Sequence, residues 1–217
     1  SKPELTELVK ATLPHSDFLI FPSEWAKEKI GYTGENCKVI HNAPPEIFHK
    51  YKNVEDTIGP RVKIVTHHWS KNPKKGFHIY AQLQEYICRG GDYEFTYIGR
   101  KPDEYNFFNY HSPMPAEEIA SELPRHHIYI TASIEEAGAN HVLEAMACGL
   151  PVIFHQDGGS IPNYCENYGL QFSGFADMMS KIDEMVNNYK QYKHKVLEYS
   201  NDNTSVIESY LEIVDNI

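Results

Sequence analysis

The chain has 217 residues, of which 41% are hydrophobic and 23% charged, so its composition is that of a globular protein and excludes a disordered or fibrous one. No run approaches the roughly 18 apolar residues of a membrane span, and the first residues lack the apolar stretch of a signal peptide. The net charge of -10 argues against general nucleic-acid binding, because a phosphate backbone would be repelled. One short basic patch, residues 71–75, suits a small anion better than a duplex.

The cysteines are far apart and form no C-x-x-C pair: Cys37, Cys88, Cys148 and Cys165. This spacing favours reduced thiols over a metal site or a disulfide framework. We therefore expect a cytoplasmic protein.

Residues 1–57 contain too few elements to close a domain. We expect a strand at 18–21, a helix at 24–30 and a strand at 37–40, followed by a proline-rich turn at 42–45. We interpret the segment as a remnant of an N-terminal domain, most of which is missing here, plus an interdomain linker.

Residues 58–200 alternate β-rich runs with helical stretches, the pattern of a doubly wound parallel sheet covered by helices. The expected strands are 62–66, 93–98, 128–131 and 152–154, and the expected helices are 77–87, 116–122 and 141–147. Ligands bind such sheets beyond the carboxyl ends of the strands. The loops starting near His67, Gly99, Ser133 and His155 should therefore form the site. Residues 175–217 read as helical, with 201–217 as a separate C-terminal helix.

The most informative segment is 128–153, in which a strand, a loop of small residues and a helix follow one another. We expect Asn140 to be the N-cap of this helix. The first-turn N–H groups of His141, Val142 and Leu143 would then lack intrahelical partners and stabilise an anion, such as a diphosphate, together with the helix dipole.

Two glutamates flank the start of this helix. Glu144 would lie in its first turn, near any bound phosphate, where a carboxylate is tolerated if it accepts hydrogen bonds from neutral hydroxyls such as a ribose diol. Glu136 lies eight positions earlier, on the opposite side of the loop, where it would meet the other end of the ligand. The small residues Gly138 and Ala139 between them allow the backbone to approach a ligand closely.

These residues resemble the donor site of the group 1 (family 4) retaining glycosyltransferases of the GT-B fold. The resemblance rests on Glu136-x7-Glu144 followed by Ala-Met-Ala-Cys-Gly-Leu-Pro-Val-Ile, on Pro73-Lys-Lys-Gly-Phe77, and on the glycine-rich turn His155-Gln-Asp-Gly-Gly-Ser-Ile-Pro162. It extends to Phe21-Pro-Ser-Glu-Trp25 and Val39-Ile-His-Asn42, which resemble the end of the N-terminal domain and the linker. Nearly the whole chain is covered.

The resemblance implies a Rossmann-like C-terminal half of a GT-B enzyme that binds a nucleoside-diphosphate sugar without a metal ion. Glu144 would bind the ribose, and Glu136 would face the sugar. Lys75 and the helix N-terminus would bind the diphosphate and stabilise it as it leaves. The remaining implied donor contacts are Asn140, His141, Val142, Gly138, Ala139 and Lys71, with the base near Ser112, Pro113 and Met114. The acceptor, and any peripheral contact with a membrane, would belong to the missing half.

The chain departs from the family pattern at three places. Ser70 stands where the family usually has an arginine, so Lys71 would have to supply the second cation. The family's Glu-Gly-Phe-Gly is Glu-Ala-Gly-Ala here, which leaves the sugar undetermined. The stretch 100–106 is too short for the helix that relatives insert, which predicts a trimmed base pocket.

Two other functions stay open at this point: a nucleotide-sugar-binding module without catalysis, and an NDP-sugar epimerase on the same fold. His67 and His68 have no third ligand at convincing spacing, so we assign them to loop packing or a hydrogen bond to ligand rather than to a metal.

Overall fold

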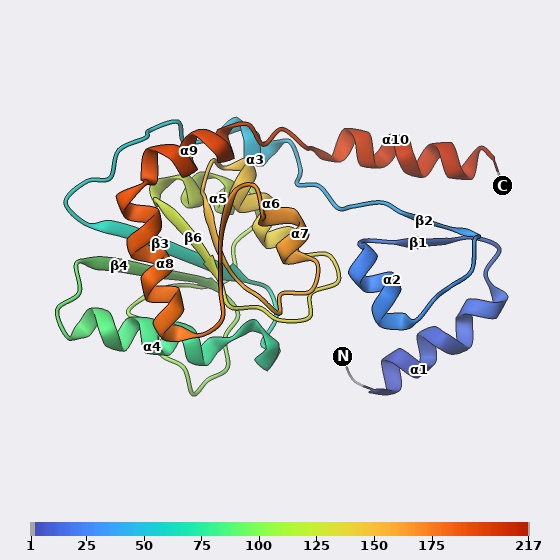
Figure 1. The fold of residues 1–217 in the computed structure, drawn as a ribbon, viewed down its shortest axis with the longest axis horizontal. Coiled ribbons are helices and arrows are strands. Elements are labelled where there is room, and N and C mark those ends of the chain that lie inside the picture. Colours follow the sequence, from blue (N-terminus) through green and yellow to red (C-terminus); the bar gives the residue numbers. More distant parts are fainter. Residues whose placement is uncertain (1–2, 217) are drawn as a thin grey trace.

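The computed structural model describes residues 3–216, with side chains from Glu7 onward. Figure 1 shows a main α/β part and, beside it, a smaller part formed by the first 40 or so residues. Ser1, Lys2 and Ile217, the outermost residues of the predicted terminal segments, lie outside the described residues. No helix of the described chain is both long and apolar enough to cross a membrane.

The main part is built on a six-stranded sheet in the order β5-β4-β3-β6-β7-β8, in which every neighbouring pair is parallel. Its strands are β3 (Val62–His68), β4 (Tyr93–Gly99), β5 (Asn109–His111), β6 (Ile128–Thr131), β7 (Val152–His155) and β8 (Gly169–Phe172). The central strand β6 is buried along its whole length, as expected for a parallel sheet covered on both faces. The predicted doubly wound fold is confirmed.

Helices cover the two faces of the sheet in two separate cores. On one face pack α4 (Phe77–Cys88) and α8 (Phe175–Asn187), through side chains such as Leu83 and Ile182. On the other pack α3 (Ile47–Lys50), α5 (Ala116–Glu122), α6 (Asn140–Ala147), α7 (Ile161–Cys165) and α9 (Tyr189–Leu197), the last through Val196. Helix α6 therefore lies on this face of the sheet, and its first turn lies near the carboxyl end of β6, the strand that precedes it in the chain.

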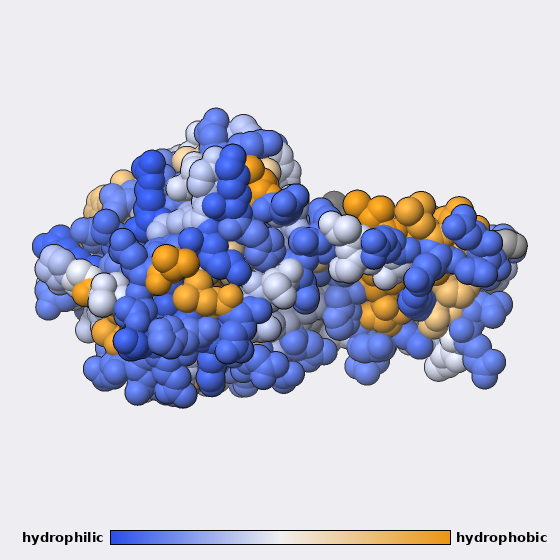
Figure 2. Space-filling view, turned by 90° about the horizontal axis from the view of Figure 1, so that it is seen from above, coloured by the Kyte–Doolittle hydropathy of each residue, from blue (hydrophilic) through white to orange (hydrophobic). Residues whose placement is uncertain are grey.

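The smaller part contains α1 (Pro3–Thr12), a 3-10 turn (Leu13–His15), and the parallel pair β1 (Leu19–Phe21) and β2 (Cys37–Val39) joined by α2 (Glu24–Ile30). The side chain of Ser23 caps α2 by accepting a hydrogen bond from the Ala26 N–H. The last helix, α10 (Asn203–Val214), extends beside this part, and Glu212 pairs with Lys38 at 3.6 Å (Figure 1). Apolar side chains including Ile207, Leu211 and Val214 are exposed along α10 (Figure 2).

Several element boundaries differ from the sequence-based expectations. Strand β3 continues through His68, so both histidines lie on the strand and the loop begins later than predicted. The edge strands β5 and β8 and the short helices α3 and α7 were not predicted, because each has five residues or fewer and little periodicity. The C-terminal region predicted as helical forms three helices, α8, α9 and α10.

A buried lysine supports the C-terminal end of α6. Lys193 on α9 is fully buried, and its Nζ donates a hydrogen bond of 2.6 Å to the carbonyl oxygen of Gly149. Burial lowers the pKa of Lys193 to about 8. The lysine thus satisfies a carbonyl at the helix end that carries partial negative charge.

We predict that Lys193 makes stability depend on pH in the alkaline range. Between about 8 and 10.4, the unfolded chain keeps a proton on this lysine that the folded chain has lost, so folding stability rises with pH. The free energy of unfolding of the wild type, relative to Lys193→Met, should rise by up to about 1.4 kcal/mol per pH unit. Urea unfolding between pH 7 and 10 measures it.

The control for this prediction is Lys195→Met, which changes an exposed lysine on the same helix. Its free energy of unfolding should run parallel to that of the wild type. A wild-type curve that stays parallel to that of Lys193→Met would contradict the assigned burial.

Candidate functional site

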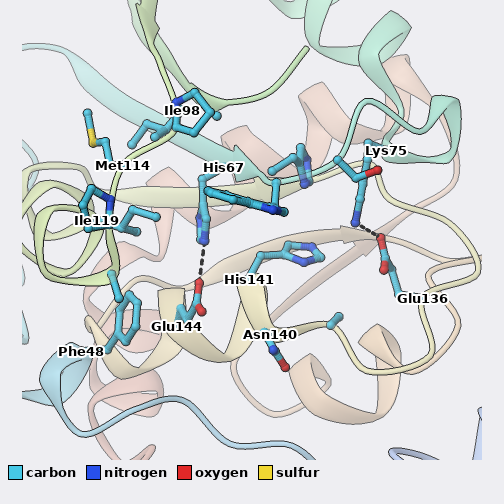
Figure 3. Close-up of a pocket in the computed structure, with 18 of the residues that line it drawn as sticks. Phe48, His67, Lys75, Ile98, Met114, Ile119, Glu136, Asn140, His141 and Glu144 are labelled. Carbon is cyan, nitrogen blue, oxygen red and sulfur yellow. Dashed lines mark hydrogen bonds and ion pairs between the residues drawn. The ribbon is translucent and has the colours of Figure 1, made fainter. Parts of the chain in front are cut away.

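A cavity of about 540 Å³ opens at the carboxyl ends of β3 and β4 and above the start of α6 (Figure 3). Nine of the predicted site residues line it: Lys75, Pro113, Met114, Glu136, Gly138, Ala139, Asn140, His141 and Glu144. Three do not. Val142 is buried in the core, Lys71 pairs with Asp103 at 3.1 Å on the surface, and Ser112 lies outside the lining. Lys71 therefore does not supply a second cation inside the cavity.

Lys75 and Glu136 meet at one end of the cavity. Lys75 ends a 3-10 turn (Pro73–Lys75), and its Nζ donates a hydrogen bond to Oε1 of Glu136 (Figure 3). Gly76 follows with φ 77°, and a Cβ there would lie 2.4 Å from the carbonyl oxygen of Ala132. Glycine at this position thus brings the lysine turn against the end of β6. Only 14% of the Lys75 side chain and 19% of the Glu136 side chain is exposed, so the pair is poorly screened by water.

The loop after β7 holds Glu136 in place through the backbone. Glu136 donates its N–H to the carbonyl of Gly158 at 3.2 Å, and its own carbonyl accepts from Ser160 N–H at 2.8 Å. Gly159 makes this approach possible, because a Cβ on it would lie 2.4 Å from the carbonyl oxygen of Glu136. The loop expected to begin near His155 thus contributes to the site by holding the backbone of Glu136. His155 itself does not line the cavity.

Glu135 and Glu136 are adjacent but serve different lysines. Glu135 has a left-handed backbone (φ 54°), which is uncommon for a residue with a side chain. Its carboxylate pairs with Lys74, and with Lys29 of α2 at 3.5 Å, outside the cavity lining. The reversal at Glu135 therefore separates the two carboxylates and leaves Glu136 to the cavity.

The smaller part of the molecule also contacts this loop. The hydroxyl of Ser23 donates to the carbonyl of Ala137 at 2.6 Å, and Nδ2 of Asn42 donates to Oδ1 of Asn140 at 2.8 Å. Gly138 packs here as well, since a Cβ on it would lie 2.7 Å from Nδ2 of Asn42. The loop between Glu136 and Glu144 is thus held from two sides.

The start of α6 differs from the prediction. Asn140 is the first residue of the helix and makes no capping hydrogen bond, because its side chain accepts from Asn42 instead; Ala139 occupies the cap position. The N–H of Val142 donates to the carbonyl of Ala139 at 3.2 Å. Contrary to the prediction, it is therefore not free to bind an anion. Glu144 is the fifth residue of α6 and lies in the second turn rather than the first.

Glu144 forms a hydrogen bond with a histidine that the sequence reasoning did not include among the site residues. Its Oε2 lies 2.7 Å from Nε2 of His67, and the two side chains are 20% and 7% exposed (Figure 3). The signal for His67 in the sequence was its place directly after a buried apolar run, at the carboxyl end of a predicted strand. Its pairing with Glu144, 77 positions away, depends on the sheet order.

Two further histidines form the floor of the cavity and are uncharged. Burial lowers the pKa values of His68 and His141 well below the usual range, and the nearby positive charge of Lys75 adds to the effect. His68 contacts the hydroxyl of Tyr80 at 2.8 Å, and His141 contacts that of Thr131 at 3.0 Å. Among the described lining residues, Lys75 is the only lysine or arginine. No cluster of three or more metal-binding side chains occurs among residues 7–216, whose side chains the structure describes.

The opposite end of the cavity is apolar. Phe48 from α3, Ile98 from β4 and Met114 and Ile119 from the β5–α5 region form it (Figure 3). Trp69 lies at the rim, 64% exposed, and the guanidinium of Arg100 stacks 4.6 Å from its ring centroid. Phe48 escaped prediction because the linker was not expected to contribute a helix.

The cavity thus offers three environments in sequence. An apolar end is followed by the carboxylate of Glu144, and then by the cation of Lys75 beside Glu136 (Figure 3). This order suits an elongated ligand that has an apolar ring at one end, hydroxyls in the middle and an anion beyond them.

Solved structures similar to the chain include two that contain UDP and a sugar. Anabaena HepE, solved with UDP and glucose, has a TM-score of 0.74 and 15% identity, and the match covers 100% of this chain and 68% of that one. Sucrose-phosphate synthase from Thermosynechococcus elongatus gives 0.74 and 15%, over 97% and 61% of the two chains. The pneumococcal O-GlcNAc transferase GtfA, solved with UDP and GlcNAc, gives 0.70 and 14%, over 99% and 47%. At these identities the likeness shows the fold alone.

The chain is shorter than these proteins and spans between about half and two thirds of their length. None of the curated proteins is similar enough in sequence to count as a match. The sequence model of the family "Glycosyl transferases group 1" matches residues 72–201, which is more than half of the chain and includes Lys75, Glu136 and Glu144. The chain therefore belongs to the group 1 glycosyl transferases, and its sheet is the Rossmann-like sheet of their GT-B fold.

Proposed function

We propose that the chain is the donor-binding domain of a retaining glycosyltransferase, which moves a sugar from a nucleoside-diphosphate sugar to an acceptor bound elsewhere. The observation that carries the proposal is the order of environments in one cavity: apolar side chains, then Glu144, then Lys75 with Glu136. A nucleoside-diphosphate sugar presents matching groups in the same order, namely a base, a ribose, a diphosphate and a sugar.

In this proposal the base lies at the apolar end beside Pro113 and Met114. The ribose hydroxyls donate hydrogen bonds to Glu144, which tolerates the nearby phosphates because it interacts with neutral groups. The diphosphate lies between Lys75 and the N-terminal end of α6, where the charge of the lysine and the helix dipole act in the same direction. The sugar extends toward Glu136.

The Lys75–Glu136 pair has a role in this chemistry. When the bond between the sugar and the diphosphate breaks, negative charge builds on the leaving oxygen, and Lys75 stabilises it. Glu136 holds the ammonium group in the cavity before the donor binds, so less reorganisation is needed afterward. Its second oxygen stays available to accept a hydrogen bond from a hydroxyl of the sugar.

We further propose that the acceptor binds to a domain outside this chain. Support comes from the cavity, which is occupied along its length by the donor in this arrangement, and from the greater length of the similar solved chains. A preceding domain, to which residues 1–57 and the helix after residue 200 attach, would close over the sugar end of the cavity.

The first test is nucleotide binding. Calorimetric titration with UDP, GDP and ADP should detect binding of at least one of them. Lys75→Gln should weaken it about tenfold or more, because a charge-assisted hydrogen bond to phosphate is lost and Glu136 is left unpaired. Lys74→Gln, which changes the neighbouring lysine outside the cavity, should alter the affinity by less than about twofold. Binding of none of the nucleotides would contradict the donor site.

The second test concerns divalent cations. Because Lys75 and α6 offset the charge of the diphosphate in this proposal, EDTA should leave the affinity for the bound nucleotide unchanged within about twofold, and adding Mg²⁺ should not raise it further. The same titrations in EDTA and in Mg²⁺ measure this. A loss of nucleotide binding in EDTA would show that a metal ion is needed to bind the diphosphate.

The third test concerns turnover. The 217-residue chain should bind nucleotide but transfer sugar far below the usual enzymatic rate of about 1 per second or more. In a longer protein that contains the chain, Glu136→Ala should abolish transfer and retain nucleotide affinity, and NMR of the wild-type product should show a retained anomeric configuration. Conversion of the donor without an acceptor would identify an epimerase. Absence of turnover in the 217-residue chain and in the longer protein would identify a binding module.

A further inference from the structure

His67 is held rigidly at the end of β3. Beyond Val65 this strand no longer pairs with β6, since the paired positions are Ile64 with Ile128 and Val65 with Tyr129. Here the hydroxyl of Tyr129, a side chain of β6, replaces the backbone of β6 as the hydrogen-bonding partner. It accepts from the N–H of His67 at 3.1 Å and lies 3.2 Å from the carbonyl oxygen of the same residue. On the other side His67 pairs in register with Ile98 of β4. The backbone of His67 is therefore fixed from both neighbouring strands.

The ring of His67 is confined as well. It packs edge-on against the rings of Tyr129 and His141, at centroid distances of 5.4 and 6.3 Å. Only 7% of the side chain is exposed. Its one polar contact among the described residues is the hydrogen bond of 2.7 Å from Nε2 to Oε2 of Glu144.

This contact fixes the tautomer of the ring. A carboxylate only accepts hydrogen bonds, so Nε2 of His67 carries the proton and donates it to Glu144. Nδ1 is buried without a hydrogen-bond partner among the described residues. His67 thus donates from Nε2 to one oxygen of Glu144.

We propose that His67 is a positioning residue that makes the site selective for a ribose diol. By occupying Oε2 of Glu144, it stops the carboxylate from rotating and presents Oε1 to the cavity. A carboxylate held this way accepts hydrogen bonds from the 2′- and 3′-hydroxyls, at a defined distance from the base end formed by Ile98. This inference rests on the proposed donor site and goes beyond it, because it assigns the discrimination between ribose and deoxyribose to a histidine that acts through Glu144.

The experiment compares ribonucleotides with their 2′,3′-dideoxy counterparts by calorimetry. The pair used is UDP and 2′,3′-dideoxy-UDP, or the corresponding pair for GDP or ADP, whichever diphosphate the wild type binds most tightly. The wild type should prefer the ribonucleotide by about tenfold or more. His67→Leu should reduce the preference to about twofold or less, because Glu144 is no longer held. His67→Gln, whose amide can donate to Glu144, should restore most of the preference.

Two controls separate positioning from folding. His78→Leu removes an exposed histidine on α4, outside the cavity, and should keep the wild-type preference. If His67→Leu does not fold, His67→Asn replaces it, since the shorter amide cannot reach Glu144. A general loss of structure would weaken both nucleotides equally, whereas the proposed role changes the ratio of their affinities.

The possible results distinguish this inference from the proposed function. If the wild type binds no nucleoside diphosphate, the donor site itself is wrong, and the inference falls with it. If the wild type prefers ribose and His67→Leu keeps that preference, the donor site stands and the role of His67 is overturned. Binding without any preference for ribose would overturn both the Glu144 contact and the role of His67, but not the diphosphate site.

Discussion

The site depends on the backbone contact between the loop after β6 and the loop after β7. Glu136 is bound through its N–H and its carbonyl to Gly158 and Ser160, and Gly159 permits the close approach. This contact holds one side of the segment between β6 and α6, and Ser23 and Asn42 hold the other. As a result, Glu136 faces Lys75 across the cavity, and α6 begins where its N-terminal end opens on the same space.

The sequence was sufficient for the four central strands of the sheet and for nine of the residues that line the cavity. Apolar runs such as 128–131 predicted the buried strands, and the glycines and prolines between elements predicted their ends, because these signals are local. Glu136 and Glu144 were predicted because they flank the start of a helix, and Lys75 because residues 73–77 resemble the family pattern. The prediction that Asn140 caps α6 was wrong because its side chain binds Asn42, almost 100 positions away, instead of the helix backbone. No local sequence pattern reveals such a distant partner. The pairing of His67 with Glu144 and the place of Phe48 in the cavity were not predicted for the same kind of reason, since they follow from the order of strands and the packing of a linker helix.

Among the described residues, the cavity lining contains one lysine, Lys75, and it pairs with one carboxylate, that of Glu136. The histidines beside Lys75 are uncharged because they are buried, and the second acidic residue of the loop, Glu135, is turned outward to Lys74 and Lys29. Glu144 forms a hydrogen bond with Nε2 of His67. Within the part of the chain that the structure describes, Lys75 is therefore paired with a single carboxylate and is not part of a network of competing ion pairs.

The contacts from Ser23 and Asn42 to the loop before α6 have a mechanical consequence. Residues of the smaller part are attached at Ala137 and Asn140, between the two glutamates, and Tyr164 of α7 adds a hydrogen bond to the carbonyl of Pro22 at 2.7 Å. A rotation of the smaller part about the linker must stretch these bonds or carry the loop along. The smaller part and the loop between the two carboxylates are thus joined by hydrogen bonds, so a change in the angle between the two parts would act directly on that loop.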